Sequence, residues 1–259
     1  MSFDVVAANY DQEFTQHPIG LWLRQRIQAR LAQLFSAGDV VLEIGCGTGE
    51  DAIWLAQRGI KVVATDASPM MLEITQRKVS SLGLDDFVTC RLLDLNQLPL
   101  WKESLRFNGV FSNFGPINCT ERYSDLADFL MRHLQSGAKL GFGVMSPFCL
   151  WESVWHSLHL DFKTAFRRLK KQQLVTFADG TQFLVYYPSV KRLMNAFMPH
   201  FKKLGVMGLG VWVPPSDIFG VLERHPRLLR LSYWLERQTA AYWPFRTWAD
   251  HYWLEMAYV

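Results

Sequence analysis

The chain lacks the features that would place it outside ordinary globular proteins. Its 259 residues contain no apolar run of the roughly 18 residues that a membrane-spanning helix needs. No cationic stretch followed by an apolar one opens the sequence, so we expect no signal peptide. Internal repeats and low-complexity tracts are absent as well. These observations predict a cytoplasmic protein without a membrane span.

Cysteine is scarce, and its spacing matches no metal site. The four cysteines form no C-x-x-C pair, and the seven histidines show no ligand spacing. We therefore expect reduced, buried thiols and no metal ion. The cysteines are Cys46, Cys90, Cys119 and Cys149.

Excess charge of one sign is also missing. The net charge is +3, with 14 Lys and Arg against 8 Asp and Glu in residues 151–259. Nucleic-acid-binding domains usually carry a basic stripe or a recognisable module, and this chain has neither. The hydrophobic content of 49% is ample for the core of one domain. We expect solvated helix faces and no nucleic-acid partner.

The most informative stretch is 40–50, which reads Val-Val-Leu-Glu-Ile-Gly-Cys-Gly-Thr-Gly-Glu. An apolar run ends next to an acidic residue, and three glycines at alternate positions precede a helical pattern. Glycine allows positive φ and lets a ligand lie against the backbone at a helix N-terminus. The pattern predicts a buried strand, a tight turn and a helix that bind a ligand. A turn that serves only strand–helix packing stays open as an alternative.

Strand and helix patterns alternate along the first half of the chain, after an amphipathic helix from Pro18 whose arginines are expected on its polar face. This alternation predicts a parallel sheet with helices on both faces. The expected strands are 39–44, 60–65, 87–92, 109–113 and 139–145.

The pattern changes after Pro147. Helical spacing over 151–169 is followed by a β-hairpin, with strands 174–177 and 182–187 around the turn Ala178-Asp179-Gly180. Seven of the ten tryptophans follow residue 150, which suggests that an apolar pocket for a substrate lies in this part of the chain. Further on we expect a helix at 189–200, a strand at 206–213, helices at 216–223 and 226–240, and a last strand at 251–258.

Acidic residues help to choose the ligand. A dinucleotide loop needs Gly or Ala where this chain has Glu50, and Asp51 adds a second carboxylate that would repel a pyrophosphate. A sulfonium-bearing nucleoside carries no phosphate, and its positive charge tolerates both carboxylates. Asp66, after the second strand, can accept both ribose hydroxyls, and Asp94-Leu95, after the third, can meet an adenine. Together they mark the sheet edge where open α/β sheets bind ligands.

These motifs resemble the class I S-adenosylmethionine-dependent methyltransferases, most closely the small-molecule branch that includes quinone biosynthesis. The resemblance covers residues 39–145 and rests on Glu43-x-Gly45-x-Gly47-x-Gly49, Asp66, Asp94-Leu95 and Asn113-Phe114-Gly115-Pro116. It implies S-adenosyl-L-methionine as the cofactor, with the glycine loop at the methionine part and Tyr10 over its carboxylate end. The implied cofactor contacts are Tyr10, Glu43, Gly45, Cys46, Gly47, Gly49, Asp66, Ala67, Met71, Asp94, Leu95 and Asn113.

The resemblance implies a Rossmann-like, doubly wound, seven-stranded and mostly parallel sheet, with a helix and hairpin insert forming a lid after strand five. We expect one domain over residues 1–259. Its parts are an N-terminal helical cap (1–38), the cofactor-binding core (39–146), the substrate-binding insert with a late core strand (147–245) and the closing strand (246–259).

Methyl transfer is an in-line displacement that mainly needs positioning, and a base is needed only for some acceptors. Candidate bases are His17, His156 and His159, although each also fits a surface or capping role. Tyr187, at the end of the hairpin, could overhang the cofactor. The segment 113–116 lacks the Asp/Asn-Pro-Pro-aromatic tetrad of enzymes that methylate bases, which argues again against nucleic acid.

We therefore expect a methyltransferase that acts on O, N or C of a hydrophobic, aromatic small molecule. Two alternatives stay open: a cofactor-binding protein of the same fold that has lost transfer, and, less favoured, a nicotinamide-dependent oxidoreductase. Residues 214–241 either cap the pocket or form a homodimer contact.

Overall fold

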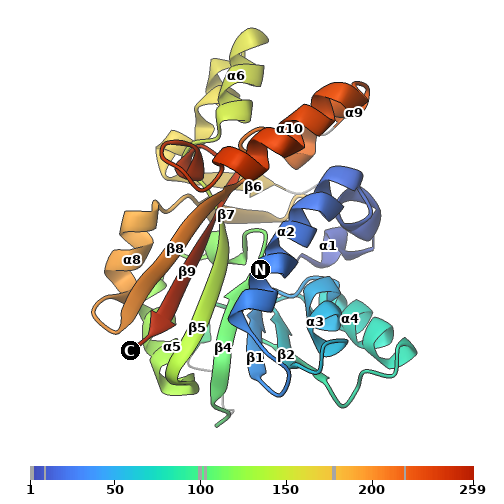
Figure 1. Cartoon of the computed structure of the whole chain (residues 1–259), viewed down its shortest axis with the longest axis vertical. Helices are drawn as coiled ribbons and strands as arrows, with labels where there is room; N and C mark the ends of the chain where they lie inside the picture. Colours follow the sequence, from blue (N-terminus) through green and yellow to red (C-terminus); the bar gives the residue numbers. More distant parts are fainter. Residues whose placement is uncertain (1–2, 9, 99–100, 102–103, 177–178, 219) are drawn as a thin grey trace.

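A seven-stranded sheet forms the centre of the computed structural model, which describes residues 3–8, 10–98, 101, 104–176, 179–218 and 220–259 (Figure 1). The strand order is β3-β2-β1-β4-β5-β9-β8; the first five pair in parallel, whereas β9 pairs antiparallel with both β5 and β8. The Rossmann-like expectation is confirmed. The strands are β1 Val40–Ile44, β2 Lys61–Asp66, β3 Val88–Leu92, β4 Phe107–Ser112, β5 Leu134–Met145, β8 Phe201–Leu209 and β9 His251–Tyr258.

Helices cover both faces of this sheet because its strands are apolar on both sides. Successive side chains of a strand point to opposite faces. In β1, Val41 packs in the cluster beneath the helices α2, α3 and α4, whereas Leu42 packs in the cluster beneath α5 and α8. These helices are α2 Pro18–Leu34, α3 Glu50–Ala56, α4 Pro69–Ser81, α5 Tyr123–His133 and α8 Val190–Phe197.

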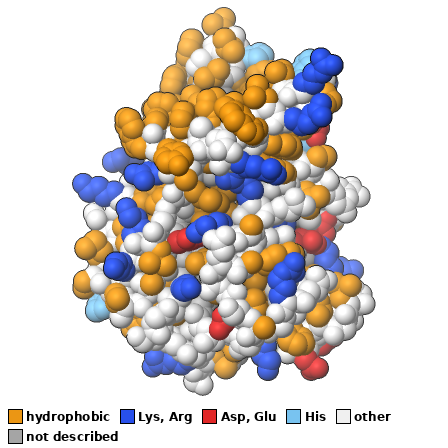
Figure 2. Space-filling model, viewed as in Figure 1, with side chains coloured by type: hydrophobic (Ala, Val, Ile, Leu, Met, Phe, Trp, Pro, Cys, Tyr) orange, Lys and Arg blue, Asp and Glu red, His pale blue; other side chains and the backbone are white. Residues whose placement is uncertain are grey.

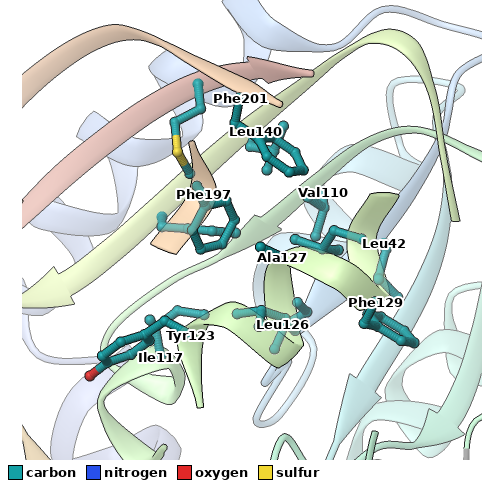
Figure 3. Packing of buried hydrophobic residues seen from close by; sticks show 14 of the residues in the cluster. Leu42, Val110, Ile117, Tyr123, Leu126, Ala127, Phe129, Leu140, Phe197 and Phe201 are labelled. Atoms are coloured by element: carbon teal, nitrogen blue, oxygen red, sulfur yellow. The ribbon is translucent and has the colours of Figure 1, made fainter. Parts of the chain in front are cut away.

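The cluster beneath α5 is shown in Figure 3. Leu126 and Ala127 on α5 belong to the same buried cluster as Leu42, Val110 and Leu140, which come from three neighbouring strands. All five are at most 4% exposed. Burial of this kind stabilises a domain by about 25 cal/mol per Å² of apolar surface, and it holds the strand ends that carry the site.

The insert after β5 contains short helices and one hairpin. The single helix expected over 151–169 is wrong as a continuous element, because Leu160 has φ 60° and Asp161 caps a new helix through Thr164 N–H. Helical spacing alone does not report such a break. The elements are α6 Leu150–Leu158, α7 Phe162–Ala165, the 3-10 turn η4 Arg167–Lys170, β6 Gln172–Thr176 and β7 Gln182–Tyr186.

Two further expectations need correction. The strand expected at 206–213 begins at Phe201 and ends at Leu209, because Gly210 turns the chain with φ 79°. The helix expected over 216–223 is a 3-10 turn, η5 Ser216–Ile218, and a short helix, α9 Gly220–Glu223, with residue 219 outside the described residues. The long helix α10 Pro226–Thr239 follows. Residue Ala178 of the expected hairpin turn also lies outside the described residues.

A buried ion cluster ties the insert to β9. Arg168 Nη2 donates to Glu152 Oε2 at 2.9 Å and to Asp250 Oδ1 at 2.6 Å. Burial opposes ionisation of Asp250, but the neighbouring His251 and Arg168 outweigh it and hold the pKa of that carboxyl well below its ordinary value. The cluster therefore holds α6 and η4 in place against the sheet.

No helix within the described ranges has both the length and the apolar composition that crossing a bilayer demands.

A packing test follows from Gly141 in β5. A Cβ there would lie 2.2 Å from Trp253 Cζ2 on the neighbouring strand, and Trp253 is 1% exposed. Gly141→Ala should lower the free energy of unfolding by about 1–3 kcal/mol, as overpacking does. Urea unfolding measures the change. Gly220→Ala, with open space around the added atom, is the control and should be neutral or slightly stabilising; equal midpoints for both variants would contradict the packing argument.

Candidate functional site

A cavity of about 370 Å³ lies beyond the carboxyl ends of β1, β2 and β4 and reaches the hairpin β6–β7. Its wall has two chemically different parts. The core part is rich in acids and backbone amides, and the insert part is mostly apolar. Eleven of the twelve cofactor contacts expected from the sequence line it: Tyr10, Glu43, Gly45, Cys46, Gly47, Asp66, Ala67, Met71, Asp94, Leu95 and Asn113.

The three glycines of the loop, Gly45, Gly47 and Gly49, have different surroundings. All have positive φ. A Cβ on Gly45 would lie 2.1 Å from Pro116 Cγ, and one on Gly49 would lie 2.5 Å from Thr75 Cγ2, so these two permit close packing. Gly49 is the one expected contact that is not among the lining residues. At Gly47 an added Cβ would have one neighbour within 4 Å among the described residues, Tyr10 Cε1 at 3.8 Å, which leaves open space facing the cavity.

Asp66 stands at the end of β2, beside this loop. Its Oδ2 accepts from Gly47 N–H at 2.9 Å, and its Oδ1 accepts from Ser68 N–H at 2.9 Å. Burial raises the pKa of this carboxyl, although the two backbone N–H groups and that of Ala67 act against the rise. The carboxylate is thus held rigidly at the cavity wall by main-chain groups.

Asp94 occupies the corresponding place after β3. Its Oδ1 accepts from Asn96 N–H at 2.8 Å, which forms a tight turn, and its Oδ2 accepts from Gln97 Nε2 at 3.2 Å. Leu95 lines the cavity in the same turn and is 7% exposed. The acids expected at the ends of the second and third strands therefore share one cavity.

A buried network around Asp51 was not expected. Arg24 Nη1 donates to Asp51 Oδ2 at 2.7 Å, and Asn113 Nδ2 donates to the same oxygen at 2.9 Å. The amphipathic pattern of α2 predicted its arginines on the polar face, but Arg24 is 7% exposed and lines the cavity. Its position in the stripe 20, 24, 27 and 31, all buried, is the signal that could have revealed it.

Glu43 and Asn113 bring unpaired acceptors to the cavity wall. Among the described residues, neither Glu43 Oε2 nor Asn113 Oδ1 has a hydrogen-bond partner, and both atoms are buried. Burial raises the pKa of Glu43 well above its ordinary value, the negative charges of Asp51 and Asp66 raise it further, and Arg24 offsets only part of the rise. A cationic donor group fits this corner of the cavity.

The N-terminal segment lies against the same end of the cavity. Asp11 accepts from Thr48 Oγ1 and from Lys78 Nζ, both at 2.6 Å. Asp4, in α1 Asp4–Ala7, accepts from Ser68 Oγ and from Met70 N–H. These bonds hold Tyr10 at the glycine loop.

The insert supplies the apolar part of the wall. The hairpin contributes Val175, Phe183 and Val185, and Phe3 from the N-terminal segment meets Phe183 edge to face at 5.1 Å between ring centroids. Phe3 was not expected here, because a single aromatic near the chain start carries no local signal.

Tyr187 lines the cavity next to these side chains, with its Oη 3.4 Å from Gln173 Oε1. Burial raises the pKa of its phenol, and the nearby Arg168 and Arg167 offset part of the rise. At neutral pH the Oη therefore keeps its proton and acts as a hydrogen-bond donor.

The candidate histidines lie elsewhere. His17 Nε2 is 3.0 Å from Glu223 Oε1, His156 Nδ1 is 3.8 Å from Asp161 Oδ2, and His159 is exposed with Nδ1 2.8 Å from Trp155 O. No histidine is among the described residues that line the cavity. The structure thus corrects the placement of His17 and His156 at the site: they serve a surface ion pair and a helix end.

The sequence matches known proteins in the region that builds this site. Residues 41–137 match the methyltransferase domain family. A demethylmenaquinone methyltransferase from Clavibacter sepedonicus is 34% identical over 141 residues, which are 53% of this chain and 54% of the relative. The chain spans about half or less of the length of the first curated relatives that it matches.

Solved structures share the fold over most of the chain. An S-adenosylmethionine dependent methyltransferase from Mesorhizobium loti superposes with a TM-score of 0.56 at 16% identity, covering 92% of this chain and 96% of the other. The cyclase SpnF superposes with a TM-score of 0.58 at 15% identity, covering 90% and 80%. Residues 41–137 thus carry a methyltransferase domain, and the seven-stranded sheet around it has the fold of solved S-adenosylmethionine dependent methyltransferases.

Proposed function

We propose that the protein transfers a methyl group from S-adenosylmethionine to a hydrophobic, aromatic small molecule. The observation that carries the proposal is one cavity with an acidic half on the core and an apolar half on the insert. A donor and an acceptor of different polarity then bind side by side, as displacement requires. The relatives named for demethylmenaquinone support an acceptor of this kind.

The residues present fit the cofactor. Glu43 Oε2 and Asn113 Oδ1, buried and without partners among the described residues, are acceptors for its ammonium group. Asp66 would accept from the ribose hydroxyls, and Asp94 with Leu95 would meet the adenine. Gly47 leaves space for the methionine part beneath Tyr10. When bound, the cofactor supplies an activated methyl group on a sulfonium.

The chain's own contribution is positioning and exclusion of water. Holding two reactants in a near-attack arrangement contributes roughly 7–11 kcal/mol in favourable cases. Val175, Phe183 and Val185 hold the apolar body of the acceptor, and Tyr187 donates a hydrogen bond from its protonated Oη to an acceptor oxygen. Since no histidine is among the described residues of the wall, a proton released by the acceptor is not taken by His17 or His156.

A second candidate function has a specific observation in its favour. The cyclase SpnF shares this fold, so a cofactor-binding protein without methyl transfer is a coherent alternative. Such a protein would bind S-adenosylmethionine and form no methylated product.

A nicotinamide-dependent oxidoreductase is disfavoured, because Glu50 stands where a dinucleotide-binding loop needs Gly or Ala and lines the cavity where a pyrophosphate would lie.

The division of roles is tested first on the cofactor. Asp66→Ala should weaken S-adenosylmethionine binding about 10–100-fold, the loss expected when a charged hydrogen-bond acceptor is removed. His17→Ala, outside the cavity, should bind as the natural protein does. Isothermal calorimetry measures both. An equal loss in the two variants would show that the acidic edge is not the cofactor site.

Glu43 gives a prediction with opposite signs for stability and binding. Its folded-state pKa lies above its unfolded value, so its contribution to stability is full below about pH 4.3 and is lost as pH rises toward the folded-state pKa. Glu43→Gln should therefore raise the free energy of unfolding of the ligand-free protein by about 1–2 kcal/mol at about pH 8, with a smaller gap at about pH 5. Urea unfolding at both pH values measures it.

The same Glu43→Gln variant should bind S-adenosylmethionine about tenfold more weakly, because a charged acceptor is lost. A stability gap that does not change with pH would contradict the buried ionisation of Glu43.

Transfer itself is tested with labelled cofactor and a lipid-soluble extract of the producing cells. Mass detection should find a product heavier by one methylene unit. Tyr187→Phe should slow its formation about 3–10-fold, the effect of losing one neutral hydrogen bond, and leave cofactor affinity unchanged. Tight cofactor binding without any product would favour the non-transferring alternative, and an unchanged rate would reduce Tyr187 to part of the wall.

A further inference from the structure

The insert carries large apolar side chains on its outside. Figure 2 shows hydrophobic side chains gathering over the part of the molecule formed by α6, α10 and the chain that follows α10. We call this surface, made of the exposed side chains of residues 154–169 and 228–248, the insert face. Its most exposed members are Leu158 (75%), Leu160 (79%), Phe162 (57%), Trp234 (57%), Tyr242 (68%) and Trp243 (76%).

Direct contacts join the start of α6, which carries the first segment of the insert face, to the end of the second segment. Leu150 N–H, at the start of α6, donates to Trp248 O at 2.9 Å, and the Phe148 and Trp248 rings lie 5.9 Å apart between centroids. The Arg168 cluster fixes η4 to Asp250 just beyond. The apolar side chains therefore belong to one supported surface.

The exposed charged side chains in and beside these segments are almost all basic. Within 150–171 and 220–250 the only exposed acid is Asp161; Glu152, Glu236 and Asp250 are buried, and Glu223 pairs with His17. Lys and Arg side chains flank the hydrophobic area in Figure 2. The exposed basic residues are Lys163, Lys170, Lys171, Arg224, Arg227, Arg230, Arg237 and Arg246.

The backbone conformation and exposure of Leu160 are unfavourable for a leucine. Its φ of 60° lies in the left-handed region, which a leucine adopts at a cost and which Asn or Gly adopts readily. With 79% of its surface exposed, little packing offsets that cost. Packing within the described residues therefore gives no reason for a leucine at this position.

We propose that the insert face docks on an anionic lipid bilayer. Aromatic and aliphatic side chains that enter the interface, with Lys and Arg beside them for anionic headgroups, are the combination that holds peripheral proteins on membranes. A second copy of the chain fits less well, since two basic faces would meet. The surface is continuous with the cavity wall: η4 places Arg167 on the cavity and Leu169, 58% exposed, on the outside.

Docking would thus bring the apolar half of the cavity close to lipid. This consequence concerns the acceptor, whereas the docking itself does not depend on methyl transfer.

Co-sedimentation of the full chain with vesicles tests the proposal. Phosphatidylcholine vesicles containing phosphatidylglycerol should bind it, and pure phosphatidylcholine should bind it at least about tenfold more weakly, because each Lys or Arg near an anionic surface adds about fivefold in affinity. High salt should reduce the difference. The double variant Leu158→Gln/Leu160→Asn should lose about tenfold in affinity.

Its matched control is Leu82→Gln/Leu204→Gln, which removes two leucines of 53% and 49% exposure outside the insert face and should bind as the natural chain does. Leu160→Asn alone should unfold at the same or a higher urea concentration, which separates loss of docking from misfolding.

Three results would overturn the proposal. One is absence of binding to anionic vesicles, and another is an equal loss in both double variants. The third is a dimer in sedimentation velocity that Leu158→Gln/Leu160→Asn abolishes, which would assign the insert face to chain–chain contact. A protein that binds anionic vesicles but forms no methylated product from S-adenosylmethionine and the lipid-soluble extract would refute the proposed function alone.

Discussion

The site depends on a reversal in the sheet. After β1 the chain passes to the face that carries α3, and after β4 it passes to the opposite face, which carries α5. Because β1 and β4 are neighbours, the two connections part and leave a crevice beyond the carboxyl ends of the strands. The glycine loop, Asp66 and Asn113 all stand at this crevice, so the cavity is a direct product of strand order.

Buried carboxyl groups and unpaired acceptors in this crevice favour a ligand that donates hydrogen bonds, and they lower the stability of the ligand-free protein. Glu43, Asp51 and Asp66 are all buried near one another, and the charge of Arg24 offsets part of the rise in the pKa of Glu43. The unpaired Glu43 Oε2 and Asn113 Oδ1 are costly in a ligand-free protein. Such acceptors are typical of sites whose ligand supplies the missing donor, and they disfavour a phosphate.

The insert joins the cavity to the outer surface. Arg168, Glu152 and Asp250 form a buried cluster that holds α6 and η4 against β9. With these elements fixed, one side of the insert walls the apolar half of the cavity and the other side exposes leucine, phenylalanine and tryptophan among basic residues. A single buried ion cluster therefore supports both surfaces.

Local patterns were enough to predict the parallel sheet, the glycine loop and the acids at the ends of β1, β2 and β3, because apolar runs, glycine spacing and strand-end residues are signals within one segment. The positions of Arg24 and Phe3 at the cavity, and of His17 and His156 outside it, became visible only in the folded chain. These outcomes rest on contacts between residues far apart in the chain, such as Arg24 with Asp51 and Phe3 with Phe183, and no periodicity within one segment reports such contacts.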